Sequence, residues 1–290
     1  MEMKRLISLF LLAGAIMACT KTVPAPKPDI TSEGLSVVSA DIETLLLGGE
    51  QARHWKDGDA IGLFGSEAGN NEKYLLRKAD ANLSSATFYG PLVKGETITA
   101  YYPYEPSFSG SATEMSTTLE SVQVYEEEVG AVKQFLNYCP RAYAFLRNDR
   151  LKFNYPFGVL AVRISLDEIL TVHSLSLNSP SSSLSGLAVI HPDGATMAPG
   201  TPQGVKLLCN GGVASRDEGG NVREFFMITV PGTYEDLKLS IEVEGEPAIL
   251  CELGSITIPR IDAAGFALAS VTLKSGGPDS FEPVSVHFDE

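Results

Sequence analysis

Leu237-Lys238-Leu239-Ser240-Ile241-Glu242-Val243-Glu244 alternates apolar and polar residues without interruption. Successive side chains of a β-strand point to opposite faces, so this pattern puts four apolar side chains on one face. The run therefore predicts a half-buried strand with one face toward the core and the other toward water.

The same period of two recurs along the chain from Leu35 onward. Further alternating runs are found at residues 160–166 (LAVRISL), 173–177 (HSLSL) and 284–288 (VSVHF). Residues 225–230 (FFMITV) are apolar on both faces, which is typical of a central strand. Turn-forming pairs such as Asp57-Gly58 separate the runs. Only residues 130–138, which are followed by Pro140, have a helical pattern. We therefore predict an all-β protein built from β-sandwiches.

The first 19 residues have the layout of an export signal with a lipid attachment site. A basic start precedes an apolar run from Leu6 to Met17, which is shorter than the roughly 20 residues that span a bilayer. Ile16-Met17-Ala18-Cys19 resembles the lipobox of bacterial lipoproteins, in which the cysteine becomes the acylated first residue. The resemblance implies a signal peptide at 1–18 and an outer-membrane protein anchored through acylated Cys19. Residues 19–34 contain three prolines and read as an extended tether.

Composition limits the function classes. The 290-residue chain carries a formal net charge of −14, which disfavours binding to nucleic acid. The chain is long enough for two domains, which we expect at 35–150 and 151–290. Its hydrophobic fraction of 44% is enough to form their buried cores. Cys139, Cys209 and Cys251 form neither a disulfide framework nor a zinc pattern, so we expect buried free thiols, with a Cys209–Cys251 bridge as the alternative.

No enzymatic, cofactor or metal constellation is found in the sequence. The four histidines are scattered, and neither a nucleophile elbow nor a phosphate-binding loop is present. Asp57-Gly58-Asp59 has oxygen ligands but lacks the further acidic ligands of a calcium loop, and a hairpin turn explains it better. The sequence thus predicts a protein that is not an enzyme.

Residues 54–64, His-Trp-Lys-Asp-Gly-Asp-Ala-Ile-Gly-Leu-Phe, are the most specific stretch of the chain. They resemble a segment of the fimbrillin-like lipoproteins of Bacteroides-group bacteria. Weaker matches follow in the family's order at residues 100–104 (AYYPY), 151–155 (LKFNY), 174–177 (SLSL), 184–186 (LSG), 228–232 (ITVPG) and 271–273 (VTL). Tyr155 departs from the family, which usually has histidine there.

This resemblance implies two transthyretin-like β-sandwich domains in tandem and a role as a fimbrial subunit, anchor or tip that mediates adhesion. In the family's major subunits, an arginine-directed protease removes the leader and first strand, and a strand of the next subunit fills the groove. Arg53 is the candidate cleavage site here, and residues 35–42 are the removable strand. Val284, Val286 and Phe288 form the candidate donor strand. The alternatives are that Arg53 is an ordinary loop residue and that the tail pairs within its own domain.

A glycan-binding surface lipoprotein is the alternative function. Exposed aromatic rings stack on sugars, and the candidate rings are Trp55, Tyr101, Tyr102 and Tyr104. Trp55 at a strand end is more often a core residue than a binding platform. Exposed, coplanar rings in the structure would favour the glycan hypothesis.

Overall fold

The computed structural model describes residues 35–43, 45–47, 50–52, 55–67, 69–127, 129–166, 168–191, 194–200, 203–261, 266–277 and 280–289. Strands dominate this part of the chain, which confirms the all-β class. The expected helix at 130–138 is confirmed as α1 (Ala131–Tyr138), and one short 3₁₀ turn is found at Lys78–Asp80. The signal at 1–18 and the tether at 19–34 lie outside the described residues.

Seven strands of the N-terminal part close into a barrel, in the order β1-β11-β10-β7-β4-β5-β6. They are β1 (Ser36–Ile42), β4 (Ala60–Gly65), β5 (Glu72–Leu76), β6 (Ser85–Gly90), β7 (Ile98–Tyr102), β10 (Ala142–Arg147) and β11 (Arg150–Phe153). The ring closes because β1 pairs antiparallel with β6 and parallel with β11. We expected a β-sandwich here, whereas these seven strands form a closed barrel, which leaves no free strand edge.

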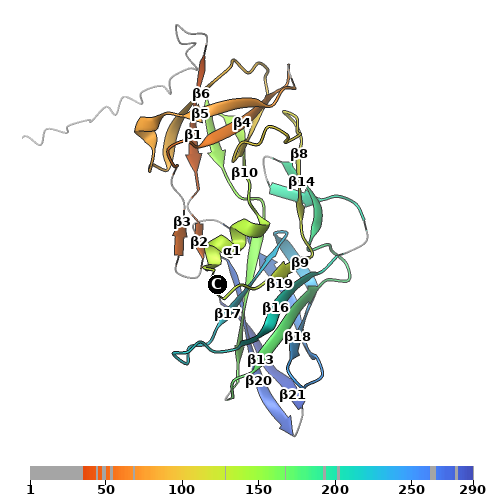
Figure 1. The fold of residues 1–290 in the computed structure, drawn as a ribbon. Coiled ribbons are helices and arrows are strands. Elements are labelled where there is room, and N and C mark those ends of the chain that lie inside the picture. The colour runs from red at the N-terminus through yellow and green to blue at the C-terminus, as the bar shows by residue number, and fades with distance from the viewer. Residues whose placement is uncertain are drawn as a thin grey trace, which may run out of the picture.

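The C-terminal part consists of two sheets that face each other across an apolar core (Figure 1). One sheet contains, in order, β17 (Glu224–Thr229), β12 (Gly158–Ser165), β20 (Ala267–Gly277) and β21 (Ser280–Asp289). The other contains β19 (Ile249–Ile258), β18 (Gly232–Val243), β13 (Thr171–Asn178), β16 (Val205–Ala214) and β9 (Val122–Val124). Strand β18 includes the alternating run at 237–243, and its Leu237, Leu239 and Ile241 are fully buried.

Strand pairing crosses the division that we expected near residue 150. Strand β11 pairs with β10 and β1, so residue 150 begins the second strand of a barrel hairpin. In the other direction, β9 pairs with β16 of the C-terminal sandwich. A third sheet joins β8 (Met115–Leu119) to β14 (Gly186–His191) and β15 (Gly194–Met197). The two halves of the chain are therefore interleaved through several strands.

Strand β17 corrects one expectation. We predicted that FFMITV would be central, but β17 lies at the edge of its sheet. It is apolar on both faces because each face contacts a different core: Phe225 and Met227 pack in the sandwich, while Phe226 and Ile228 belong to the cluster that includes the barrel core. The helix α1 packs beside it (Figure 1).

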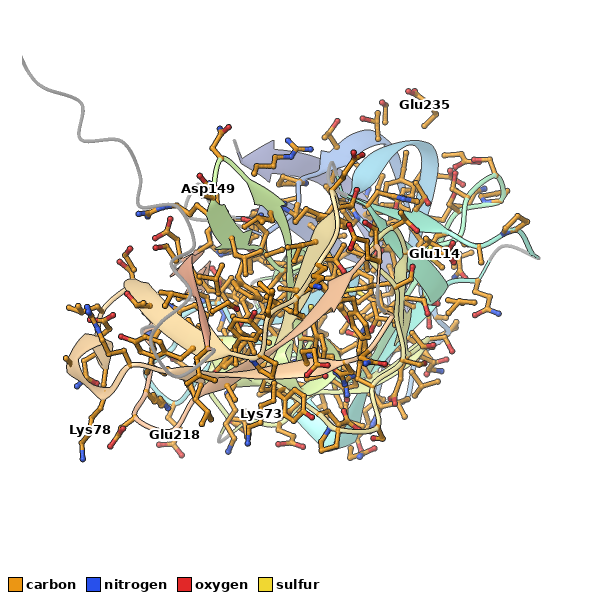
Figure 2. All side chains as sticks on the ribbon, turned by 90° about the horizontal axis from the view of Figure 1, so that it is seen from above. Lys73, Lys78, Glu114, Asp149, Glu218 and Glu235 are labelled. Atoms are coloured by element: carbon orange, nitrogen blue, oxygen red, sulfur yellow. The ribbon has the colours of Figure 1, made fainter. Side chains whose placement is uncertain are left out.

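Most charged side chains lie at the periphery, with Asp80 buried as an exception. Figure 2 shows Lys73, Lys78 and Glu218 projecting from one side and Asp149 and Glu235 from the other. This arrangement keeps the charged groups hydrated while both cores remain apolar.

Candidate functional site: the first strand of the barrel

Strand β1 occupies a slot between two neighbours. Residues Ser36–Asp41 pair with Gly90–Ser85 of β6, and Ser39–Ile42 pair with Arg150–Phe153 of β11. Ala40 and Ile42 are buried in the barrel core, and the half-buried Val38 packs against it. The side chains that point into the core thus recur at every second residue, as in any strand with one face toward a core.

Polar contacts hold both ends of β1. At its start, the Ser36 hydroxyl contacts the Tyr74 hydroxyl and donates to the Pro91 carbonyl at 3.1 Å. Burial raises the pKa of Tyr74, so this phenol stays protonated. At its end, Arg150 Nη1 lies 2.7 Å from both carboxylate oxygens of Asp41.

The segment after β1 reaches the core again. The hairpin of β2 (Leu45–Leu47) and β3 (Glu50–Ala52) buries the side chains of Leu45 and Leu47 and contacts α1. Arg53 and His54 lie outside the described residues. The description resumes at Trp55, whose backbone N–H donates to the Leu83 carbonyl at 3.0 Å. Removal of residues up to 53 would take β1 away from β6 and β11 and leave an open slot between these two strands.

The tail strand pairs within its own chain. Strand β21 runs antiparallel to β20, with Val286 opposite Val271 and Phe288 opposite Ala269. It forms the edge of its four-stranded sheet. The side chains of Val284, Val286 and Phe288, like Cys19 and Arg53, lie outside the described part of the structure, so the donor-strand, lipidation and cleavage assignments remain predictions.

The aromatic residues that suggested a sugar platform are mostly core residues. Trp55 and Tyr101 are completely buried, and Tyr102 is 4% exposed. Tyr104 is half-buried and stacks on Tyr101 with ring centroids 6.4 Å apart. These rings do not form the exposed platform that glycan binding at this site would require.

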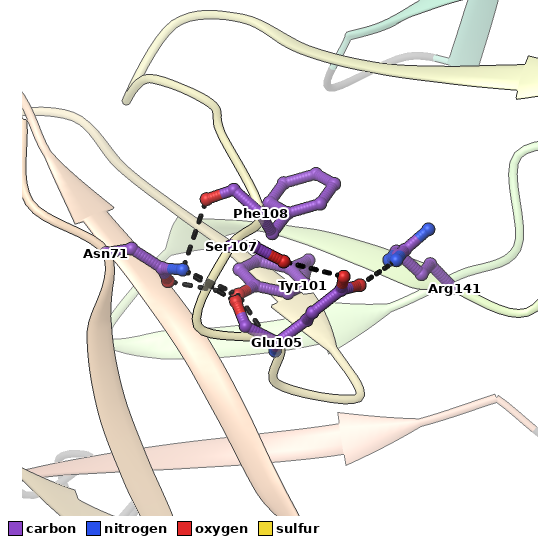
Figure 3. Close-up of polar contacts among 6 residues, drawn as sticks. All are labelled: Asn71, Tyr101, Glu105, Ser107, Phe108 and Arg141. Atoms are coloured by element: carbon purple, nitrogen blue, oxygen red, sulfur yellow. Dashed lines mark hydrogen bonds and ion pairs between the residues drawn. The ribbon is translucent and has the colours of Figure 1, made fainter.

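Tyr101 instead holds the loop that follows β7 (Figure 3). Its hydroxyl donates to the Glu105 carbonyl at 2.7 Å and accepts from Asn71 Nδ2 at 2.9 Å. Asn71 Nδ2 also lies 3.2 Å from the Phe108 carbonyl. The Glu105 carboxylate contacts Arg141 and accepts from the Ser107 hydroxyl at 2.8 Å, and these contacts lower its pKa. The AYYPY segment is therefore a structural support.

The Asp57-Gly58 pair forms a turn with Gly58 at φ +88°, a conformation that favours glycine. Asp59 accepts a hydrogen bond from the Lys56 N–H at 2.7 Å. The turn precedes β4, but β4 pairs with β5 and β7, so it does not link two paired strands as a hairpin would. Among the described residues no cluster of three metal-ligating side chains is found.

Two glutamines that the sequence did not single out cover the open edge of β17. Gln123 of β9 donates to the Ile228 carbonyl at 2.7 Å and accepts from the Ile228 N–H at 2.9 Å. Gln134 of α1 donates to the Phe226 carbonyl at 3.3 Å. Side chains thus replace the backbone of a missing neighbouring strand. A polar residue inside an otherwise apolar helix face was the only sequence signal for Gln134.

The three described cysteines are free and buried, as expected. Burial raises the pKa of all three thiols, that of Cys209 to about 12 and that of Cys251 to about 11. With raised pKa values these thiols are protonated at pH 8. They are therefore unreactive, because the thiolate is the reactive form.

We expect a variant with Cys19→Ser to show no reaction with a thiol reagent at pH 8 while folded. After denaturation, three thiols should react, since unfolding restores ordinary thiol pKa values. A colorimetric thiol assay with and without guanidinium checks this. One fast-reacting thiol in the folded chain would contradict the burial of these side chains.

Comparisons with known proteins find similar solved structures only. A candidate cell adhesion protein from Bacteroides uniformis has a TM-score of 0.46 and 15% identity, and covers 89% of this chain and 98% of its own. One from Bacteroides ovatus has a TM-score of 0.44 and 12% identity over 87% of this chain and 96% of its own. The tip fimbrial protein Mfa3 from Porphyromonas gingivalis, truncated at its C-terminus, has a TM-score of 0.40 and 10% identity over 88% and 99%.

No family model and no curated protein matches the chain. The TM-scores are below 0.5 and the identities at most 15%, so the site rests on this chain's own residues. None of the helices in the described ranges is long and apolar enough to cross a membrane.

Proposed function

We propose that this chain is a fimbrillin-like surface lipoprotein, anchored through acylated Cys19, that takes part in fimbrial assembly and adhesion by strand exchange. In this proposal its two parts are the tandem transthyretin-like domains of the family, nominally 35–150 and 151–290. The observation that carries it is the place of β1, a single N-terminal strand that closes the barrel and precedes Arg53.

Strand exchange has a physical basis at this slot. Loss of β1 exposes the backbone of β6 and β11 and the core around Ala40 and Ile42. A donor strand restores the main-chain hydrogen bonds and fills the same positions with alternate side chains. The tail has apolar residues at the same period of two in Val284, Val286 and Phe288.

The tail must leave its own sheet to serve as donor. Strand β21 pairs with β20 along most of its length, and among the described strands of the sheet none pairs with its other edge. Release of an edge strand breaks one row of hydrogen bonds, whereas a central strand would break two. If nothing cuts the chain at Arg53, it would serve as a membrane-retained anchor or accessory protein.

Cleavage by an arginine-specific protease is the decisive test. We expect a new N-terminus at His54, followed by ladders of detergent-resistant oligomers, because the opened slot binds another chain's tail. N-terminal sequencing and unheated gel electrophoresis measure the two steps separately. Arg53→Gln should abolish both, whereas Arg147→Gln, at an exposed position in β10, should change neither.

A tail variant separates cleavage from assembly. Val286→Asp should leave cleavage intact and prevent oligomers, because a charged residue would replace the central pocket-filling side chain. A cut chain that has lost β1 and stays monomeric at all concentrations would contradict donor-strand assembly. Mass spectrometry of the native N-terminus tests acylation of Cys19 independently.

A further inference from the structure

A cleft of about 290 Å³ lies on the outer side of the β10–β11 hairpin. This is close to the lower end of the range for small-molecule sites, roughly 300–1,000 Å³. Its lining includes the half-buried ring of Phe145, the buried residues Tyr155 and Pro156, and the polar residues Asn154 and His191. Such a mixture of apolar and polar surface suits one pyranose ring, which has C–H faces and hydroxyl edges.

The cleft is rich in cations although the protein is acidic. Arg147, Arg150, Lys152 and Arg260 line it, and Asp41 is the only carboxylate among the described lining residues. The Asp149 side chain, at the hairpin turn, is not part of the lining and points to the periphery (Figure 2). An anion would therefore meet a local excess of positive charge.

Two carboxylates from the β1 segment, those of Asp41 and Glu43, lie beside three of these cations. Asp41 contacts Arg150 at 2.7 Å through Nη1 alone, not through the two-nitrogen fork that Arg–carboxylate pairs often use. Glu43 lies 4.0 Å from Lys152 Nζ and 3.8 Å from Arg260 Nη2, beyond hydrogen-bond distance. The contacts of Lys152 and Arg260 are thus long, and the close Asp41–Arg150 pair uses one guanidinium nitrogen, so a carboxylate that reaches both nitrogens of Arg150 could compete with Asp41.

We propose that this cleft binds a carboxylate-bearing sugar, such as a uronic acid residue, and that Asp41 and Glu43 compete with it for the cations while β1 is in place. Release of β1 removes both carboxylates and leaves Arg150, Lys152 and Arg260 to the ligand. This second part rests on the proposed cleavage, while the first part concerns the uncut chain. Processing would then couple assembly to sugar capture.

Titration of the full uncut chain, carrying Cys19→Ser, with methyl glucuronide tests the site. Isothermal calorimetry at low salt should show binding at least about tenfold tighter than that of methyl glucoside, because only the uronate offers charged hydrogen bonds. Acetate should also bind more weakly, since it lacks the ring. Added salt should weaken the uronate complex, because the cations are exposed.

Three variants assign the site. Asp41→Asn with Glu43→Gln should tighten uronate binding about fivefold, which imitates the release of β1 without any cleavage. Lys152→Gln with Arg147→Gln should weaken it about tenfold, whereas Lys94→Gln, an exposed lysine outside the cleft, should have no effect. A thermal melt of each variant establishes that the chain is folded.

Equal binding of uronate and glucoside, or equal binding of acetate and uronate, would overturn the sugar site. Unchanged affinity in the Asp41/Glu43 variant would overturn the competing role of Asp41 and Glu43. Both results come from uncut protein, so they are independent of whether Arg53 is cleaved or oligomers form.

Discussion

Replacement of Trp55 by alanine is expected to lower the free energy of unfolding by about 3–5 kcal/mol. The indole is completely buried and meets three rings edge-on: Phe88 at 4.9 Å, Tyr102 at 5.1 Å and Phe153 at 5.6 Å between centroids. Its Nε1–H donates to the Ser84 carbonyl at 3.1 Å. Because these partners come from three parts of the barrel, no single segment can move in to fill the cavity.

Urea unfolding followed by circular dichroism measures this loss, since Trp55 is the only tryptophan and fluorescence would lose its reporter. Trp55→Phe keeps most of the volume and should cost less than half as much. Val122→Ala, at a position 49% exposed, should leave the midpoint nearly unchanged. A loss under about 1 kcal/mol for Trp55→Ala would mean that the barrel core does not depend on this ring.

Gln123→Leu is expected to cost about 2–6 kcal/mol, although the two side chains have similar volumes. The change leaves the Ile228 N–H and carbonyl buried without a partner, and each such group costs about 1–3 kcal/mol. Gln134→Leu is the matched comparison. It removes a single hydrogen bond of 3.3 Å to the Phe226 carbonyl and should cost about 1 kcal/mol.

Urea unfolding followed by circular dichroism measures both losses, because Ile228 is completely buried and its unpaired backbone groups stay inside the fold. Equal stability of the Gln123 and Gln134 variants would contradict the role of Gln123 as a substitute strand.

The alternation of apolar and polar residues predicted where strands lie, but it did not predict which strands are neighbours in a sheet. The alternation at 237–243 and the burial of Trp55 follow from side-chain period and size, and both were predicted. The edge position of β17 could not be predicted, because Gln123, which bonds to the free edge of β17 at Ile228, is 105 residues away in sequence. An apolar run indicates that both faces of a strand are buried. It does not indicate whether the strand's second edge is paired with another strand or covered by side chains.

The candidate site was predictable only in part. The sequence indicated a removable strand at 35–42, and β1 (Ser36–Ile42) is found there. Its parallel pairing with β11 was not foreseen, since residues 151–155 were assigned to the second domain by composition and by family resemblance. The cationic cleft was also missed, because Arg147, Arg150 and Lys152 read as an ordinary charged turn until the fold brings the distant Arg260 and His191 beside them.

The pairing of β1 with β11 also constrains the order of events during biosynthesis. Ser39 meets Arg150 across more than a hundred residues, a high contact order that slows folding. A chain synthesised from its N-terminus completes β1 early and β11 much later. The barrel therefore cannot close until the β10–β11 hairpin has been synthesised, and during that interval β1 lacks its partner β11 and Ala40 and Ile42 lack their core.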